Sequence, residues 1–256
     1  MLSKKIIKYI QSLSHKKLRD EHAAFIAEGP KVVAELLLAK TFTCKIICAE
    51  QEWLSANKNL LDNDGVDIHE IDEGLLHKIS ALKTPNKVVA VFNKKEQNKQ
   101  PQFSKKITLI LDDINDPGNM GTIIRIADWF GIENIICSEG CVDCYNPKVV
   151  QSTMGSLARV NVLYTDLLSF ITMHKNIIVY AAALSGSDLT EYKTLQEGFI
   201  LIGNESRGIR EELLAVSETQ ITIPRYGKAE SLNAAVATGI ILSHLIFGAH
   251  AKDEKA

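Results

Sequence analysis

The second half of the chain alternates between short apolar runs and longer stretches in which apolar residues recur every three or four positions. The short runs are rich in β-branched residues and predict strands over residues 107–111, 132–137, 160–164, 177–184, 199–202 and 221–223. The longer stretches predict helices over residues 123–130, 149–157, 167–174, 209–216 and 232–247. Near-continuous apolar strands between helices are typical of a parallel sheet that is covered on both faces. The expected fold class is therefore α/β.

The first part of the chain shows the same alternation in a weaker form. Helices are predicted from Pro30 onward and over 53–61 and 75–82. Strands are predicted over residues 45–48, 66–71 and 88–92. The segment 94–106 is polar and nearly free of apolar residues, which is typical of a linker. The sequence thus predicts a small N-terminal α/β domain over 1–93, a linker over 94–106 and a second domain over 107–256.

The composition is that of an ordinary globular protein, with 46% apolar and 23% charged residues among 256. No apolar run reaches the roughly eighteen residues of a membrane-spanning helix. The N-terminus also lacks the continuous apolar run of a secretory signal. We therefore expect a cytoplasmic protein.

The net charge of −2 is unevenly distributed along the chain. Residues 1–106 hold 18 Lys and Arg against 13 Asp and Glu, whereas residues 107–256 hold 11 against 18. A basic N-terminal part suits contact with phosphates. A solvated helix surface explains the same charge equally well, so both interpretations stay open.

The five cysteines include a C-x-x-C pair, Cys141 and Cys144, with Cys137 just before it. A zinc site usually needs four ligands, often two such pairs. The other two cysteines, Cys44 and Cys48, are spaced differently and lie in another part of the chain. The sequence therefore favours reduced, partly buried thiols and no metal site.

A parallel α/β sheet binds its ligand at the carboxyl ends of its strands, so the segments that follow the strands indicate the kind of site. No G-x-G-x-x-G follows a strand, which argues against a dinucleotide site. The segment Gly203–Gly208 has two glycines, but Ile209 and Arg210 follow in place of the Lys-Ser/Thr of a phosphate-binding loop.

Three other segments follow strands. The first runs from Asp116 to Arg125 and contains Asn119, where a helix is expected to begin. The second is Gly203–Gly208, with Glu205 between glycines that let backbone approach a ligand closely. The third runs from Ile223 to Asn233 and leads into a helix rich in small residues, for which Ser231 is the expected cap.

In order and spacing, these three segments resemble the signature motifs of the SpoU (TrmH-like) family of RNA ribose methyltransferases. The resemblance spans residues 109 to about 245, and Phe25, Glu28 and Gly29 resemble the start of that family's substrate-binding domain. It implies a parallel sheet with a deep C-terminal trefoil knot, S-adenosylmethionine as cofactor, and a homodimer whose site is completed across the interface. The implied reaction is methyl transfer to a ribose 2′-hydroxyl of RNA.

The resemblance also implies residue roles. The implied catalytic residues are Asn119, Arg125, Glu205, Ser231 and Asn233. The implied cofactor-binding residues are Ala183, Leu184, Gly203, Asn204, Gly208, Ile223 and Leu232. Arg125 is either a base or a clamp for the target phosphate, and because arginine stays protonated the clamp is the simpler role. A surface ion pair on an amphipathic helix is the structural alternative for Arg125.

Two other functions stay open. A non-catalytic RNA-binding protein would share the fold, and a related enzyme would methylate a base instead of a ribose. The N-terminal domain resembles those of ribosomal-RNA enzymes more than the minimal transfer-RNA ones, which favours ribosomal RNA as the substrate. Arg207, Arg225 and Lys228 beside the second and third segments would place positive charge near RNA phosphates.

Overall fold

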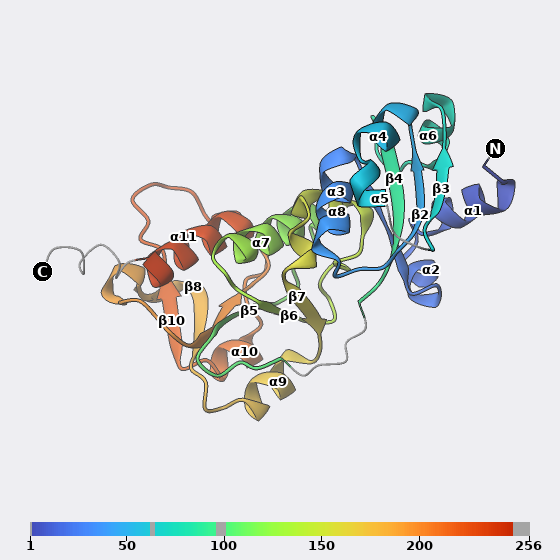
Figure 1. Ribbon diagram of the computed structural model, residues 1–256. Coiled ribbons are helices and arrows are strands. Elements are labelled where there is room, and N and C mark those ends of the chain that lie inside the picture. The colour runs from blue at the N-terminus through green and yellow to red at the C-terminus, as the bar shows by residue number, and fades with distance from the viewer. Residues whose placement is uncertain (1, 62–64, 96–100, 248–256) are drawn as a thin grey trace, which may run out of the picture. The chain divides into compact units, whose positions relative to one another are not determined.

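The computed structural model describes residues 2–61, 65–95 and 101–247 (Figure 1). The chain divides into two compact units. The first comprises Met1–Asn98 together with Asp143–Arg159, and the second comprises Lys99–Val142 and Val160–Ala256. Part of the expected linker, residues 96–100, lies outside the described residues.

A four-stranded mixed sheet forms the centre of the first unit. In spatial order its strands are β1 (Ala24–Glu28), β4 (Val88–Asn93), β2 (Cys44–Ala49) and β3 (Asp67–Glu70). The pairs β1–β4 and β4–β2 are antiparallel, whereas β2–β3 is parallel. Its helices are α1 (Lys4–Ser12), α2 (Lys16–Glu21), α3 (Pro30–Ala39), α4 (Gln51–Ala56), α5 (Lys58–Leu61) and α6 (Glu73–Ile79).

From Pro30 onward these elements match the sequence pattern, with two differences in the helices, whereas α1, α2 and β1 were not predicted. Helix α3 is confirmed: Pro30 occupies its first turn, and Gly29 before it has φ of 82°, a conformation that suits glycine. The helix predicted over 53–61 is broken at Asn57, whose side chain donates to the carbonyl of Trp53 at 2.8 Å. The helix predicted over 75–82 starts earlier and ends at Ile79.

The segment 143–159, which the sequence placed within the second domain, packs with the first unit. It contains α8 (Pro147–Thr153), which lies against β1, and the short helix η1 (Ser156–Ala158). The Arg19 guanidinium pairs with Asp143 at 2.6 Å and donates to the carbonyls of Leu13 and Ser14. Arg19 is only 2% exposed, so it does not belong to the basic surface of this unit.

The second unit contains a six-stranded sheet in which every neighbouring pair is parallel, which confirms the predicted α/β class. In spatial order its strands are β10 (Thr219–Thr222), β8 (Val179–Asp188), β9 (Gly198–Ile202), β5 (Ile107–Leu111), β6 (Asn134–Cys137) and β7 (Asn161–Tyr164). Every residue of β9 is buried, as expected for a central strand covered on both faces.

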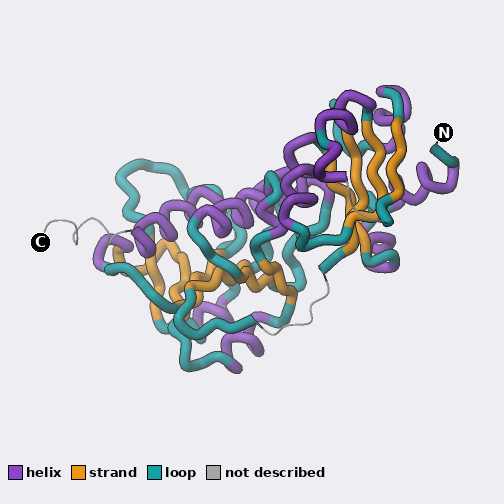
Figure 2. The backbone as a smooth tube through the Cα atoms, in the orientation of Figure 1, coloured by secondary structure: helices purple, strands orange, loops and turns teal. Residues whose placement is uncertain are grey.

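Helices cover both faces of this sheet. Figure 1 shows α7 (Pro117–Trp129) and α11 (Ala234–Phe247) along one face and α9 (Leu167–Met173) and α10 (Glu211–Ala215) along the other. The tube view in Figure 2 shows the strands of this unit as a layer between the helices. On the second face, Phe199 of the sheet packs in one buried core with Ile171 of α9 and Leu213 of α10. The C-terminal knot stays a prediction.

Candidate functional site

A cavity of about 560 Å³ lies at the carboxyl ends of β9 and β10, next to the part of β8 that extends beyond its pairing with β9. Its walls are the middle of β8, the loop that follows β9, and the loop between β10 and α11. The seven residues expected to bind a cofactor all line it: Ala183, Leu184, Gly203, Asn204, Gly208, Ile223 and Leu232. The fold thus gathers residues that are far apart in sequence around one cavity of a size suited to a small molecule.

The loop after β9 is closed on itself. The amide of Asn204 donates to the carbonyl of Gly208 at 3.0 Å, and the amide of Gly208 donates back to Asn204 at 2.8 Å. Gly208 has φ of 71°, and a Cβ on Gly203 would lie 2.4 Å from the carbonyl carbon of Gly208. Glycine at 203 is therefore required by the loop's own backbone, before any ligand is considered.

Side chains from all three sequence segments meet at Glu205. Its Oε1 accepts hydrogen bonds from the side chains of Asn119 at 2.7 Å and Asn233 at 2.6 Å, and from the backbone amide of Ala234 at 3.0 Å. The Asn233 side chain also donates to Oδ1 of Asn119 at 2.8 Å. These bonds join the first turn of α7, the loop after β9 and the start of α11, so Glu205 holds the loop after β9 against the starts of two helices.

The helix starts differ from those expected. Asn233, and not Ser231, caps α11: its Oδ1 accepts from the amides of Ala235 at 3.0 Å and Val236 at 3.2 Å. Ser231 lies exposed at the cavity instead. Helix α7 begins at Pro117, and Asp116 caps it by accepting from the amide of Asn119 at 2.8 Å.

Arg125 does not take part in the hydrogen bonds around Glu205. Six residues correspond to about 600° of helix rotation, so Arg125 and Asn119 project roughly 120° apart around α7. Arg125 is exposed, and no hydrogen bond or ion pair joins it to another residue within 2–61, 65–95 and 101–247. The structure therefore does not support the surface ion pair considered as an alternative for this residue.

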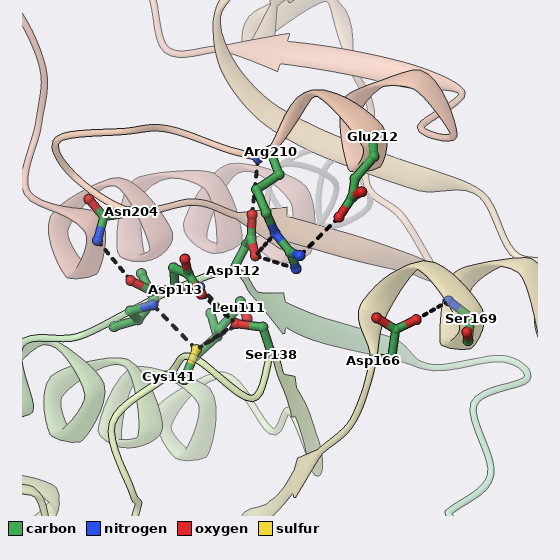
Figure 3. Close-up of polar contacts among 11 residues, drawn as sticks. Leu111, Asp112, Asp113, Ser138, Cys141, Asp166, Ser169, Asn204, Arg210 and Glu212 are labelled. Carbon is green, nitrogen blue, oxygen red and sulfur yellow. Dashed lines mark hydrogen bonds and ion pairs between the residues drawn. The ribbon is translucent and has the colours of Figure 1, made fainter.

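The sequence pattern did not identify the pair formed by Asp112 and Arg210 (Figure 3). Asp112 is buried at the end of β5 and accepts from the backbone amide of Arg210 at 3.0 Å and from its Nε at 2.9 Å. Next to it, the side chain of Asn204 donates to the carbonyl of Asp113 at 2.7 Å. Both ends of the loop after β9 are thus anchored to the end of β5. The sequence feature that could have indicated this pair is the two carboxylates, Asp112 and Asp113, directly after the buried strand β5.

Cysteine thiols form part of the same strand end, as Figure 3 shows for Cys141. The Sγ of Cys141 accepts from the amide of Ile114 at 3.3 Å and donates to the carbonyl of Leu111 at 3.3 Å. Hydrogen bonding to Cys137, and to Ser138 and Ile114, lowers the pKa of Cys141 despite its burial. All five cysteines lie in the described ranges and none forms a disulfide. Within those ranges no three His, Cys, Asp or Glu side chains group in a way that could hold a metal ion.

An apolar surface lies on the outer side of α7 and α11. We call it the α7–α11 face: it is the shallow hollow lined by Ile126, Val236, Ile240 and Phe247, together with Trp129, which is 82% exposed and follows Ile126 on α7. The three α11 residues recur at intervals of four and seven, so they form one stripe. Arg125 is one helical turn before Trp129.

Two family models match the chain. The SpoU rRNA Methylase family matches residues 106–243, and an MRM3-like substrate binding domain matches residues 4–90. None of the helices among the described residues is long and apolar enough to span a bilayer.

Similar proteins are known from sequence and from structure. The chain is 29% identical to the 23S rRNA (guanosine(2553)-2′-O)-methyltransferase RlmP of Bacillus subtilis, over 93% of this chain and 95% of that one. A TrmH-family structure from Porphyromonas gingivalis superposes with a TM-score of 0.84 at 35% identity, covering 96% and 98% of the two chains. An AdoMet-bound rRNA methyltransferase from Sinorhizobium meliloti superposes with a TM-score of 0.83 at 32% identity, covering 96% and 95%.

Proposed function

The chain belongs to the SpoU rRNA methylase family, and we propose that it transfers the methyl group of S-adenosylmethionine to a ribose 2′-hydroxyl of ribosomal RNA. The observation that carries the proposal is the meeting of Asn119, Glu205 and Asn233 beside the cavity at the strand ends. The similarity to RlmP, whose name states a 2′-O-methyltransferase of 23S rRNA, supports the choice of ribose and of ribosomal RNA.

The cavity fits S-adenosylmethionine in size and in chemistry. Leu184, Ile223 and Leu232 offer apolar side chains, while the closed loop from Gly203 to Gly208 offers backbone groups at close range. The cofactor supplies a methyl group that is already activated by the positive charge on sulfur. The protein has to hold this group in line with the incoming hydroxyl and to accept or relay the hydroxyl proton.

The residues divide that work between them. Glu205 uses one carboxylate oxygen to accept from three donors, so we assign it a positioning role that fixes the loops around the cavity. Asn119 and Asn233 complete that contact. Arg125 keeps its planar set of donors exposed, which suits binding of the target phosphate next to the reacting hydroxyl. We assign a contact with the nucleotide to Ser231, which is exposed and lines the cavity.

We further propose that two copies of the chain pair through the α7–α11 face and that Arg125 acts in the partner's site. Exposed Trp129, Val236 and Ile240 form an apolar surface that a second copy would cover. Arg125 is one helical turn before Trp129 on α7, and no hydrogen bond or ion pair joins it to Glu205.

Paired variants test this arrangement. Val236→Asp with Ile240→Asp should give a monomer in sedimentation experiments, whereas Met173→Asp, an exposed apolar site on α9, should leave the dimer intact. Mixing Arg125→Ala protomers with protomers that cannot bind the cofactor should restore methyl transfer, because one site of each mixed dimer would be complete. Inactive mixtures would place Arg125 in its own protomer's site.

The first unit is proposed to supply affinity for RNA in a cytoplasmic enzyme. Lys4, Lys5 and Lys8 are exposed on α1, and Lys16 and Lys17 on α2. Deleting residues 1–93 would be a poor test, because the segment 143–159 would lose the partners it packs against. Changing the five lysines to glutamine keeps the fold and should weaken RNA binding while reducing its dependence on salt.

Mapping of 2′-O-methyl groups in ribosomal RNA tests the function directly. Cells without the protein should lack one or a few ribose methyl groups, and the purified protein with S-adenosylmethionine should restore them. Mass spectrometry of the nucleosides separates ribose from base methylation. If the purified protein restored methyl groups on transfer RNA alone, the substrate would be transfer RNA and not ribosomal RNA. RNA binding without methyl transfer would identify a non-catalytic RNA-binding protein.

A further inference from the structure

The loop between β10 and α11 carries a fully exposed aromatic side chain at the rim of the cavity. Tyr226 lines the rim and is 99% exposed, the largest exposure among the exposed large apolar or aromatic side chains of the described chain. Buried residues such as Ile221 form the cavity floor nearby. The ring of Tyr226 therefore has both faces open and stands away from the packed part of the cavity.

Three positive side chains lie on the two loops at this end of the cavity, together with the acidic side chains of Glu205 and Glu230. Arg225 precedes Tyr226 and Lys228 follows two positions later, while Arg207 lines the cavity from the loop after β9, and all three are exposed. The Arg225 guanidinium donates to the carbonyl of Ala229 at 3.1 Å, which bends the loop around Tyr226. An open aromatic ring beside cations is the combination with which proteins bind single-stranded nucleic acid, since the ring stacks on a base and the cations contact phosphates.

The charges of S-adenosylmethionine and of RNA indicate which of the two Tyr226 contacts. The reacting centre of the cofactor is cationic, so the positive side chains of Arg207 and Arg225 at the rim, with Lys228 nearby in the sequence, suit RNA phosphates better. A base stacked on a ring at the cavity rim would also leave its ribose beside the cavity. Leu184 offers a contrast to Tyr226. It is also exposed at the rim, but its side chain is aliphatic, and its strand, β8, carries none of these three cations.

We propose that Tyr226 stacks on the unpaired base of the nucleotide that is methylated and so holds its ribose at the cavity, with Lys228 and Arg207 contacting the neighbouring phosphates. This inference rests on the proposed methyl transfer to RNA. It makes Tyr226 a determinant of which RNA structures are accepted, because a base must leave its stack to reach the ring.

Steady-state methyl transfer to ribosomal RNA from cells lacking the protein tests the inference. Tyr226→Ala should raise KM for RNA about tenfold or more, because the stacking contact is lost. Its affinity for S-adenosylmethionine, measured by calorimetry, should stay within about twofold of the unchanged protein. Tyr226→Phe and Tyr226→Trp should keep a low KM, because stacking needs only the ring. Leu184→Ala should show the opposite pattern, with weaker cofactor binding and little change in KM for RNA.

Three outcomes have distinct meanings. An unchanged KM for RNA in a folded Tyr226→Ala protein overturns the inference while the proposed function stands. Weaker cofactor binding with unchanged RNA binding assigns the ring to the cofactor and also overturns it. If the unaltered protein methylates no ribosomal RNA, the proposed function fails, and binding of fluorescent mixed-sequence RNA 12-mers still tests the stacking contact. Equal affinity of Tyr226→Ala and the unaltered protein for those oligonucleotides would reject it.

Discussion

The loops that follow β9 and β10 line the same cavity, but the first is fixed at both ends, whereas the second is fixed only at its end, where Asn233 contacts Glu205 and Asn119. The β9 loop is closed by paired bonds between Asn204 and Gly208 and anchored to the end of β5. In the β10 loop, a single internal bond from Arg225 to Ala229 is the only hydrogen bond that the described structure gives to residues 224–230. The first loop is preorganised for a ligand of fixed shape, and the second stays open for a larger and more variable one.

The two glycines of these loops show the same difference. A Cβ on Gly203 would lie 2.4 Å from backbone, whereas a Cβ on Gly227 would meet no heavy atom within 4 Å. The contrast indicates that shape is determined by the β9 loop and that the β10 loop can adapt. The β9 loop would then bind the cofactor and the β10 loop the RNA, while methyl transfer itself would depend on Arg125 of α7.

The largest expected effect comes from Arg125, which lies outside both loops. Arg125→Ala should lower turnover about a hundredfold, since a group that stabilises the transition state is lost. Arg125→Lys should also be impaired, because lysine lacks the planar set of donors. Single-turnover methyl transfer at saturating RNA and cofactor measures the effect. Lys175→Ala, which removes an exposed charge from the other side of the sheet, serves as the control.

Near-normal turnover in folded Arg125→Ala would remove this residue from the mechanism. It would also shift the chemistry to the loops, where Ser231 would be the next candidate. Cofactor affinity should be unchanged in either case, because Arg125 does not line the cavity.

The next effect separates the two loops directly. Gly203→Ala should weaken cofactor binding more than about tenfold, because the new Cβ overlaps the backbone of Gly208 and forces the loop open. Gly227→Ala should change the affinity less than about twofold, since its Cβ enters open space. Calorimetry with S-adenosylmethionine gives both values, and thermal melting shows whether the fold persists. Equal effects of the two changes would refute the contrast between the loops.

The smallest expected effect concerns the anchor of the β9 loop. Arg210→Gln leaves the buried carboxylate of Asp112 with fewer donors and should lower the free energy of unfolding by about 2 kcal/mol. Arg207→Gln, an exposed arginine on the same loop, should change it by less than about 0.5 kcal/mol. Denaturant unfolding measures both. If Arg210→Gln proved as stable as Arg207→Gln, the anchor would contribute nothing to the loop.

The sequence by itself determined the strands of the second unit's sheet and most of the helices, but it assigned residues 143–159 to the wrong unit. Periodicity predicted the six parallel strands and the helices between them, because the spacing of apolar residues along the chain reflects which face of each strand or helix is buried. The position of three polar segments after strands predicted where Asn119, Glu205 and Asn233 would gather, since parallel strands end at one edge.

Tertiary structure alone decided the pairings between distant residues. Asp112 with Arg210 and Arg19 with Asp143 are 98 and 124 positions apart, and no local pattern specifies such partners. The same holds for the cap of α11, which Asn233 provides because its side chain is already held at Glu205. Spacing encodes which side of an element is buried, but the partner of a polar group depends on which elements the whole fold brings within hydrogen-bonding distance.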